Sequence, residues 1–364
     1  MGTAPFSFRT STSKAMATKS NSKVFTVSVE TLLSHSKAVE SYLRERGDYE
    51  ALLRALGSKI EALEGFNPQQ RIPVDAIARN IDTVAHWIGE PNLGLKVAPY
   101  STRLQSRLAF FFQENTIPLL DFLRILARYA CICSEVMRME IEADREEICL
   151  NIFPNCPDSI SLHQTEGFCA SVCDIVKSTR QLKPTHVNFT HCKPDTPESA
   201  NLYTKALGVT PTFQQPATQI VFANQNQDQC TSAARPSDVS FSYIQSMEAV
   251  RHKEVDKESW AKRCNFLLKM LMLYGEPNKT VLAELLAVTP RTLQRHLTRE
   301  GETFRELLNA LRKQLAAEHI QNPDLSCEDI AFMLGYQDAA HFFRAFKNWY
   351  GLPPGQYRQT LESK

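Results

Sequence analysis

Apolar and polar positions follow the same order twice in the last hundred residues of the chain. Segments 280–300 and 326–350 each hold a helix-capping residue, a short apolar stretch with an alanine, and a tight turn; apolar positions then recur every four residues among Arg, Gln, His or Lys. Such spacing is typical of a helix with one buried face. The repeat predicts two helix-turn-helix units.

Small residues near the two turns support this prediction. Ala283 and Ala331 allow the paired helices to approach closely, and Gly335 permits the positive φ of a tight turn, at the position that Ala287 holds in the first unit. The first inward apolar residue follows the alanine by ten residues in the first unit and by eleven in the second. We therefore expect the second turn to be one residue longer.

The second helix of each unit separates an inward apolar face from an outward polar face. Thr289 is placed to cap this helix in the first unit, where Leu293 and Leu297 face inward, and Phe342 and Phe346 take the inward role in the second unit. The outward positions are Arg291, Gln294, Arg295, Thr298 and Arg299 in the first unit and His341, Arg344 and Lys347 in the second.

A third helical pattern, TFRELLNALRKQLAAEHIQ at residues 303–321, separates the two units. Thr303 and Glu306 have the spacing of a capping box, and five apolar residues follow one stripe. A helix of about 19 residues is roughly 28 Å long. Successive major-groove faces on one side of B-DNA lie about 34 Å apart. A rigid connector of this length can present both second helices to adjacent turns of one duplex.

Residues 24–224 alternate between helical and strand patterns, and we interpret them as one α+β domain. Two alternating stretches about an acidic turn at 138–154 predict a β-hairpin. Short strands are expected within 185–191 and 210–224. Helices are expected at 27–46, at 49–57, from Pro73 through Ile88, and at 119–137, 167–182 and 199–209.

The remaining segments set the domain boundaries. Residues 1–23 are rich in Ser and Thr and lack acidic residues, which indicates a disordered leader or a start codon assigned too early. Residues 225–256 are interpreted as a linker with a helix near 239–250. Residues 257–364 are expected to form an all-α C-terminal domain, in which the linker helix joins the two helix-turn-helix units.

Charge and composition limit the classes of partner. The chain has 41 Lys and Arg against 40 Asp and Glu, and residues 251–364 have 17 against 14. A nucleic-acid contact must therefore rest on a focused patch such as Arg291, Arg295 and Arg299. No apolar run reaches the roughly 18 residues of a membrane span, so no membrane partner is expected. The ten cysteines are expected to be reduced thiols.

The second unit carries a specific family signature. The stretch GYQDAAHFFRAFKNWYGLPPGQYR, Gly335 to Arg358, resembles the AraC/XylS family of bacterial transcription regulators in its Gly-aromatic turn, its Phe-x-x-x-Phe helix and its closing Gly-x-x-Pro-x-x-x-Arg run. With the first unit and the linker helix, the resemblance covers about a hundred residues.

The N-terminal half resembles the arabinose-binding-type domain of one branch of that family, which contains ornithine, virulence and quorum-sensing regulators. Its marks are Arg71-Ile72-Pro73, the Gly89-x4-Gly94-Leu95 segment, the hairpin near 139–153 and the close from Phe213 to Phe222. The family's usual His-Pro-x-Pro is replaced by His191-Cys192-Lys193-Pro194.

The resemblance implies a sequence-specific regulator of transcription, with activation rather than repression favoured by family habit alone. Its expected partners are double-stranded promoter DNA and RNA polymerase, and its place is the bacterial cytoplasm, on the nucleoid. The N-terminal domain is expected to sense an unidentified small molecule or to mediate homodimerisation. The residues expected to contact DNA are Arg291, Thr292, Gln294, Arg295, Arg299, Ala340, His341, Phe343, Arg344 and Lys347.

Other interpretations of these residues remain open. On the first unit alone, a solvated helix face explains the arginines equally well, and only the second unit and the signature favour DNA. The rival function is a ligand- or redox-sensing protein with secondary DNA binding. No metal or cofactor is expected, because Cys131-x-Cys133 and Cys169-x3-Cys173 lack zinc-site spacing. No catalytic motif is visible, so an enzyme is not expected.

Overall fold

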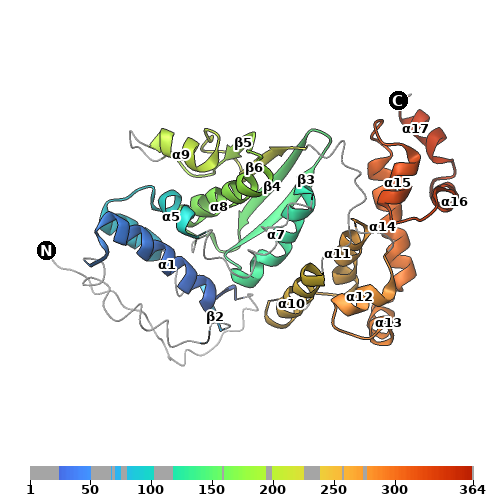
Figure 1. Cartoon of the computed structure of the whole chain (residues 1–364), viewed down its shortest axis with the longest axis horizontal. Coiled ribbons are helices and arrows are strands. Elements are labelled where there is room, and N and C mark those ends of the chain that lie inside the picture. The colour runs from blue at the N-terminus through green and yellow to red at the C-terminus, as the bar shows by residue number, and fades with distance from the viewer. Residues whose placement is uncertain are drawn as a thin grey trace, which may run out of the picture. The chain divides into compact units, whose positions relative to one another are not determined.

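The computed structural model describes residues 24–50, 67, 70–74, 80–101, 118–157, 160–193, 199–224, 238–255, 258–273 and 277–362, in two compact units (Figure 1). The first unit ends at Ala223 and the second begins at Asn224. The expected leader at 1–23, nearly all of the expected helix at 49–57, and residues 225–237 of the linker lie outside the described residues.

The first unit is the α+β unit that the sequence predicts. Its described elements are β1 Thr26–Ser28, α1 Val29–Arg46, β2 Arg71–Pro73, α4 Asn80–Ile88, α5 Leu93–Ser101, α7 Leu119–Cys133, β3 Met137–Ala143, β4 Glu147–Pro154, α8 Leu162–Arg180, β5 His186–Asn188, α9 Ser199–Leu207 and β6 Thr218–Ala223.

An antiparallel sheet with the strand order β3-β4-β6-β5 forms the centre of this unit. The predicted hairpin is confirmed, and the Asp144 carboxylate closes its turn by accepting from the backbone N–H groups of Glu146 and Glu147 at 2.8 and 2.9 Å. Ile148, Leu150 and Ile152 alternate along β4 and are all buried. This period of two is what a strand with one face on the core requires.

Several predicted boundaries in the first unit are wrong. Helix α8 begins at Leu162, after its cap Ser161, and not at Gly167. Pro73 is the last residue of strand β2, and residues 75–79 of the helix expected from Pro73 lie outside the described residues. Val27 and Ser28 form β1 instead of the first turn of α1. The two short strands pair antiparallel, with Val27 opposite Ile72, so pairing between distant segments overrides the local pattern. Helix α7 ends at Cys133 and not at Met137, because Met137 already pairs with β4.

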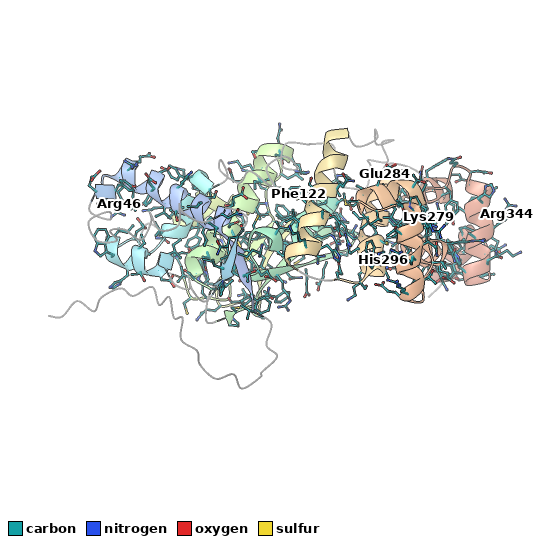
Figure 2. All side chains as sticks on the ribbon, turned by 90° about the horizontal axis from the view of Figure 1, so that it is seen from below. Arg46, Phe122, Lys279, Glu284, His296 and Arg344 are labelled. Carbon is teal, nitrogen blue, oxygen red and sulfur yellow. The ribbon has the colours of Figure 1, made fainter. Side chains whose placement is uncertain are left out.

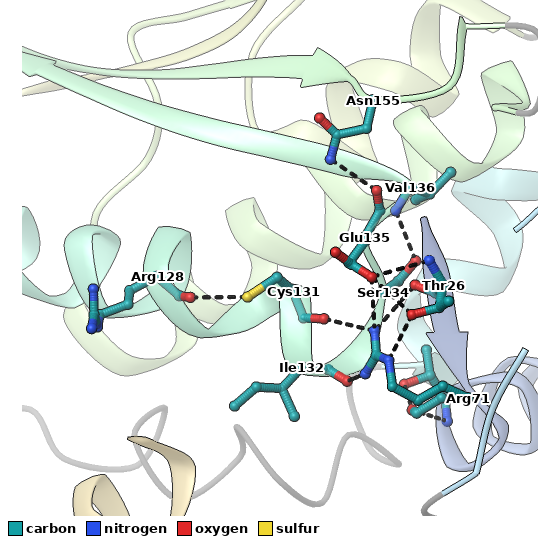
Figure 3. A network of polar contacts seen from close by, with 11 residues as sticks. Thr26, Arg71, Arg128, Cys131, Ile132, Ser134, Glu135, Val136 and Asn155 are labelled. Atoms are coloured by element: carbon teal, nitrogen blue, oxygen red, sulfur yellow. Dashed lines mark hydrogen bonds and ion pairs between the residues drawn. The ribbon is translucent and has the colours of Figure 1, made fainter. Parts of the chain in front are cut away.

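The Arg71 side chain holds this corner of the fold together (Figure 3). Its guanidinium donates to Thr26 Oγ1 at 2.8 Å and to the carbonyls of Cys131, at 3.0 Å, and Ile132 at the end of α7. It also lies 3.7 Å from Glu135 Oε2, which accepts from Thr26 N and Oγ1. Arg71 thereby joins β1, β2 and the end of α7.

Helices α5 and α8 cross at a glycine. A Cβ added to Gly94 would lie 2.1 Å from the backbone oxygen of His163, closer than any side chain can approach. The Gly94 N–H points to His163 Nδ1 at 3.5 Å, and Gly167 on α8 faces the backbone of Gly94. The Gly89-x4-Gly94 segment singled out in the sequence is therefore the place where two backbones meet.

The described part of the second unit is entirely helical, as predicted. Its elements are α10 Asp238–Glu254, α11 Trp260–Leu273, α12 Lys279–Leu285, α13 Pro290–Arg299, α14 Phe304–His319, α15 Cys327–Met333, α16 Ala339–Tyr350 and α17 Pro354–Glu362. Helix α10 packs against α12, so the expected linker at 225–256 contains a helix of the second unit.

The connecting helix α14 is shorter than expected. It has 16 residues instead of about 19, because Thr303 is its cap and Ile320 already lies beyond its last turn. Thr303 Oγ1 accepts from Glu306 N at 3.2 Å, and the Glu306 carboxylate accepts from the Thr303 hydroxyl in place of the expected backbone N–H. A helix of 16 residues is about 24 Å long.

Within the described residues, no helix is both long and apolar enough to cross a membrane.

Candidate nucleic-acid interface

Helices α12 and α13 form the first helix-turn-helix as predicted, but the cap of α12 is Asn278, which accepts from Val281 N at 2.8 Å and precedes the expected segment 280–300. Ala283 is fully buried where the helices meet, and Ala287 has φ +53°, the left-handed conformation that the turn requires. Thr289 caps α13 by accepting from Thr292 N at 3.1 Å. Leu293 and Leu297 are completely enclosed. The turn spans residues 286–289, which fixes the direction in which α13 leaves it.

The outward face of α13 is basic. Arg291, Arg295 and Arg299 are exposed and follow one another at intervals of four, so they lie along one stripe of the helix. Thr292 and Gln294 are half-buried beside that stripe. The two buried leucines of α13, Leu293 and Leu297, occupy the opposite side, so the guanidinium groups take no part in the core.

Gln294 does not stand alone on this face. Its Oε1 accepts from Lys279 Nζ at 2.9 Å, and its Nε2 donates to Thr298 Oγ1 at 3.3 Å. Lys279, which is labelled in Figure 2, begins α12 and adds a positive charge beside the Gln294 amide. Sequence reasoning missed Lys279, because only the crossing of the two helices brings it to Gln294.

Helices α15 and α16 repeat the arrangement. Phe342 and Phe346 are fully buried, and the turn at residues 334–338 is one residue longer than in the first unit, which confirms the predicted offset. Asp338 caps α16 by accepting from Ala340 N at 2.8 Å. The predicted contact residues Ala340, His341, Arg344 and Lys347 are exposed, and Phe343 is half-buried.

Two arginines that lie outside α15 and α16 fix the position of the second helix-turn-helix unit. Arg312 on α14 donates to the carbonyls of Leu334 and Gly335 at 2.9 and 2.8 Å, in the turn where Gly335 has φ +71°. Its guanidinium lies 4.0 Å from the ring centroid of Tyr336. Arg358, the last residue of the family signature, donates to the carbonyls before α15, at Ile320 and Leu325.

A second polar cluster lies inside the first unit. Glu166 on α8 is fully buried and accepts from the Tyr203 hydroxyl, while His191 Nε2 lies 3.5 Å from its carboxylate. Glu166 Oε2 has no hydrogen-bond partner among the described residues. Burial raises the pKa of Glu166 to about 7, against the smaller opposing effect of the Tyr203 hydrogen bond. Rings of Phe189 and Phe213 pack around His191 and Tyr203.

Two cysteines of the first unit, Cys169 and Cys173, are placed as expected of small apolar residues. Cys169 and Cys173 are buried on α8, and burial raises the pKa of both thiols, that of Cys173 to about 12. A protonated buried thiol is a poor nucleophile and a poor metal ligand. In the described part of the chain, no group of three His, Cys, Asp or Glu side chains is arranged to hold a metal ion.

Two domain families match the chain. Residues 47–229 match the family described as the arabinose-binding domain of AraC transcription regulator, N-terminal, and residues 282–360 match a helix-turn-helix domain. The two matches correspond to the two structural units.

Several known proteins are similar to the chain. An ornithine utilization regulator of Pseudomonas aeruginosa is 26% identical over 276 residues, which cover 75% of this chain and 80% of that protein. The urease operon transcriptional activator of Escherichia coli is 38% identical over 77 residues, 21% of this chain and 26% of that protein. The crystal structure of the regulator CdpR from Pseudomonas aeruginosa aligns with 90% of this chain and 98% of that chain, at 17% identity and a TM-score of 0.40.

Proposed function

We propose that this chain, which belongs to the AraC family of transcription regulators, controls transcription by binding two adjacent half-sites of promoter DNA. One observation carries the proposal. Two helix-turn-helix units of the same design each bury one face of their second helix completely and leave the other face polar and exposed. A helix with such an exposed face fits the major groove, where base edges offer a distinct pattern of donors and acceptors.

The side chains divide the work on α13 by their chemistry. Arg291 and Arg295 contact guanine edges or phosphates, since a guanidinium can donate two parallel hydrogen bonds to guanine. Gln294, held by Lys279 and Thr298, offers its amide to adenine once those contacts are exchanged. Arg299 lies at the end of the helix and contacts the backbone, which sets the register without reading sequence.

Helix α16 contacts its half-site with a poorer set of groups. His341 and Arg344 are its polar readers, and Lys347 neutralises phosphate charge. Ala340 and Phe343 offer only apolar surface, which suits thymine methyl groups. His341 Nδ1 lies 3.5 Å from Asp338 Oδ2, so part of its capacity is directed toward the cap of its own helix.

The first unit regulates this binding in the proposal. It responds to a small molecule or joins two copies of the chain, and the family description of residues 47–229 as an arabinose-binding domain supports the former role. An activating contact with RNA polymerase is supported by a relative named as a transcriptional activator. Binding to promoters places the protein on the bacterial nucleoid. The relatives are named as regulators, and no enzymatic role is proposed.

Recovery of DNA bound to the full-length protein in bacterial cells tests the proposal. We expect enrichment at a few promoters, over a motif of two half-sites about one helical turn apart. Arg295→Ala should lower affinity for that motif by about 10- to 100-fold, because a good arginine–base contact contributes about 1–3 kcal/mol. Arg138→Ala is the matched control, since Arg138 is an exposed arginine of the first unit. Diffuse binding that is unchanged in Arg295→Ala would overturn the proposal.

A further inference from the structure

An enclosed ion pair joins α10 to α11. Arg263 Nε donates to Glu248 Oε1 at 2.8 Å, and both side chains are buried, with 2% and 0% of their surface exposed. Removing either charge would leave the other enclosed without a counter-charge, which strongly disfavours any arrangement in which the two separate. The pair therefore fixes how α10 lies on α11.

Trp260, the first residue of α11, connects this pair to the first recognition helix. Arg263 Cζ lies 4.7 Å from the centre of the Trp260 ring. On α13, the His296 ring stacks on Trp260, with ring centroids 4.0 Å apart and an angle of 9° between planes. His252 of α10 meets the same tryptophan edge-on at 6.0 Å. One indole thus touches side chains of three helices.

The end of α13 makes a second attachment to α11. The Glu300 carboxylate, directly after the helix, accepts from the backbone N–H groups of Trp260 and Ala261, both at 2.9 Å. These are first-turn N–H groups of α11, which have no partner within their own helix and favour a negative charge. His296 and Glu300 are four residues apart, so both attachments lie on one side of α13.

The side of α13 that contacts α11 lies next to the exposed face that carries the arginines. Arg295 and Arg299 each precede an attached residue, and neighbouring positions on a helix differ by about 100°. A rotation of α13 about its axis would therefore move the arginines and break the contacts to Trp260 together. His296 is marked in Figure 2.

Helix α10 also contacts α12, the other helix of the first helix-turn-helix unit. Gln245 Nε2 donates to the backbone carbonyl of Glu284 on α12, and the two helices pack against each other. Ile244 and Met247 are buried on the same helix. Helix α10 therefore contacts α12 directly and α13 through Trp260.

We propose that α10 positions the first recognition helix, with Glu248 and Arg263 as the positioning residues, so that binding at the first half-site depends on α10 and binding at the second does not. The inference rests on the proposed function. The second helix-turn-helix unit is held in place by other contacts. Arg312 of α14 donates to the carbonyls of its turn, and Arg358 donates to carbonyls that precede α15. We therefore expect a displacement of α10 to move α13 more than α16.

The test separates positioning from general stability by using three DNA probes. Wild-type full-length protein first selects its site from random DNA, and the half-site affected by Arg295→Ala is taken as the first. The probes are the selected site, the site with the first half scrambled and the site with the second half scrambled. In Glu248→Gln, scrambling the first half should no longer matter, whereas scrambling the second half should keep its full effect. Affinity for the intact site should fall at least about tenfold.

Two further variants serve as controls. Arg312→Lys, the corresponding change at the second helix-turn-helix unit, should show the reverse pattern, in which scrambling the second half no longer lowers affinity. If Glu248→Gln fails to fold, the double variant Glu248→Leu, Arg263→Met replaces the pair with apolar groups of similar size, a change that buried pairs often tolerate. It should show the same loss at the first half-site. Equal weakening on all three probes, or none, would overturn the inference.

A measurement without DNA distinguishes this inference from the proposed function. Protein labelled with 5-fluorotryptophan gives one fluorine resonance for each of the three tryptophans. The Trp260 resonance, assigned from its loss in Trp260→Phe, should shift in Glu248→Gln and stay in place in Arg312→Lys. If wild-type protein selects no two-part site, the proposed function fails, and an unshifted Trp260 resonance sinks the positioning claim on its own.

Discussion

At the scale of single residues, the two helix-turn-helix units place different residues at a turn position that requires a positive φ. Gly335 adopts φ +71° and Ala287 adopts φ +53° at the same place in the turn. A left-handed conformation costs a residue with a Cβ about 1–2 kcal/mol. The first helix-turn-helix unit tolerates this cost because the buried contacts of Ala283 and Leu293 hold the turn closed. Alanine in place of glycine at this position therefore changes the energy of the turn and leaves its shape unchanged.

Glu166 should make the stability of the first unit depend on pH. Burial raises its pKa from 4.5 to about 7, so the folded state holds a proton that the unfolded state releases. The resulting stabilisation is fully present below pH 4.5, declines as the pH rises to about 7, and is absent above it. The shift corresponds to about 3 kcal/mol.

The Glu166 effect is measured by urea unfolding between pH 4.5 and 8, as the difference between wild type and Glu166→Gln. Glutamine keeps an oxygen that accepts from the Tyr203 hydroxyl but cannot titrate. The difference in unfolding free energy between the two proteins therefore removes the pH dependence that comes from other groups. These include His163, whose pKa burial lowers. A difference that stays constant over this range would contradict the prediction.

At the scale of elements, the close approach of α5 and α8 decides the packing of the first unit. Gly94→Ala should destabilise this unit by about 1–3 kcal/mol or more, because the new Cβ would overlap the backbone of His163, which cannot rotate away. Thermal unfolding measures the loss. Gly355→Ala is the control, since a Cβ there meets no atom within 4 Å and alanine favours its helix. Equal effects of the two substitutions would mean that helical propensity, not contact, is responsible.

At the scale of the whole molecule, two recognition helices of unequal chemistry share one chain. Helix α13 presents Arg291, Gln294 and Arg295, whereas α16 presents His341 and Arg344 among apolar groups. We predict that the first half-site is specified more stringently than the second, because hydrogen bonds to base edges discriminate more than apolar contacts do. Selection of binding sites from random DNA measures this as information content for each half. Equal content in both halves would refute the prediction.

The order of local patterns alone determined much of this protein. Periodic apolar positions predicted the hairpin of β3 and β4, helices α8 and α9, and both helix-turn-helix units, and the residues of the buried and exposed faces of α13 and α16 were identified correctly. These features follow from sequence because a helix or hairpin sorts its side chains at a period set by its own backbone. The family signature added the reason to expect DNA.

Only the tertiary structure decided which distant residues meet. Thr26 bonds to Glu135, 109 positions away, and Lys279 reaches Gln294 only because two helices cross. The pairing of Glu248 with Arg263 and the stacking of Trp260 on His296 have no periodic signal, since each partner would satisfy a helix face equally well without the other. Pairing across elements is selected by the packing of the whole unit, where an enclosed charge or ring must find its partner, and that selection leaves no mark on local sequence order.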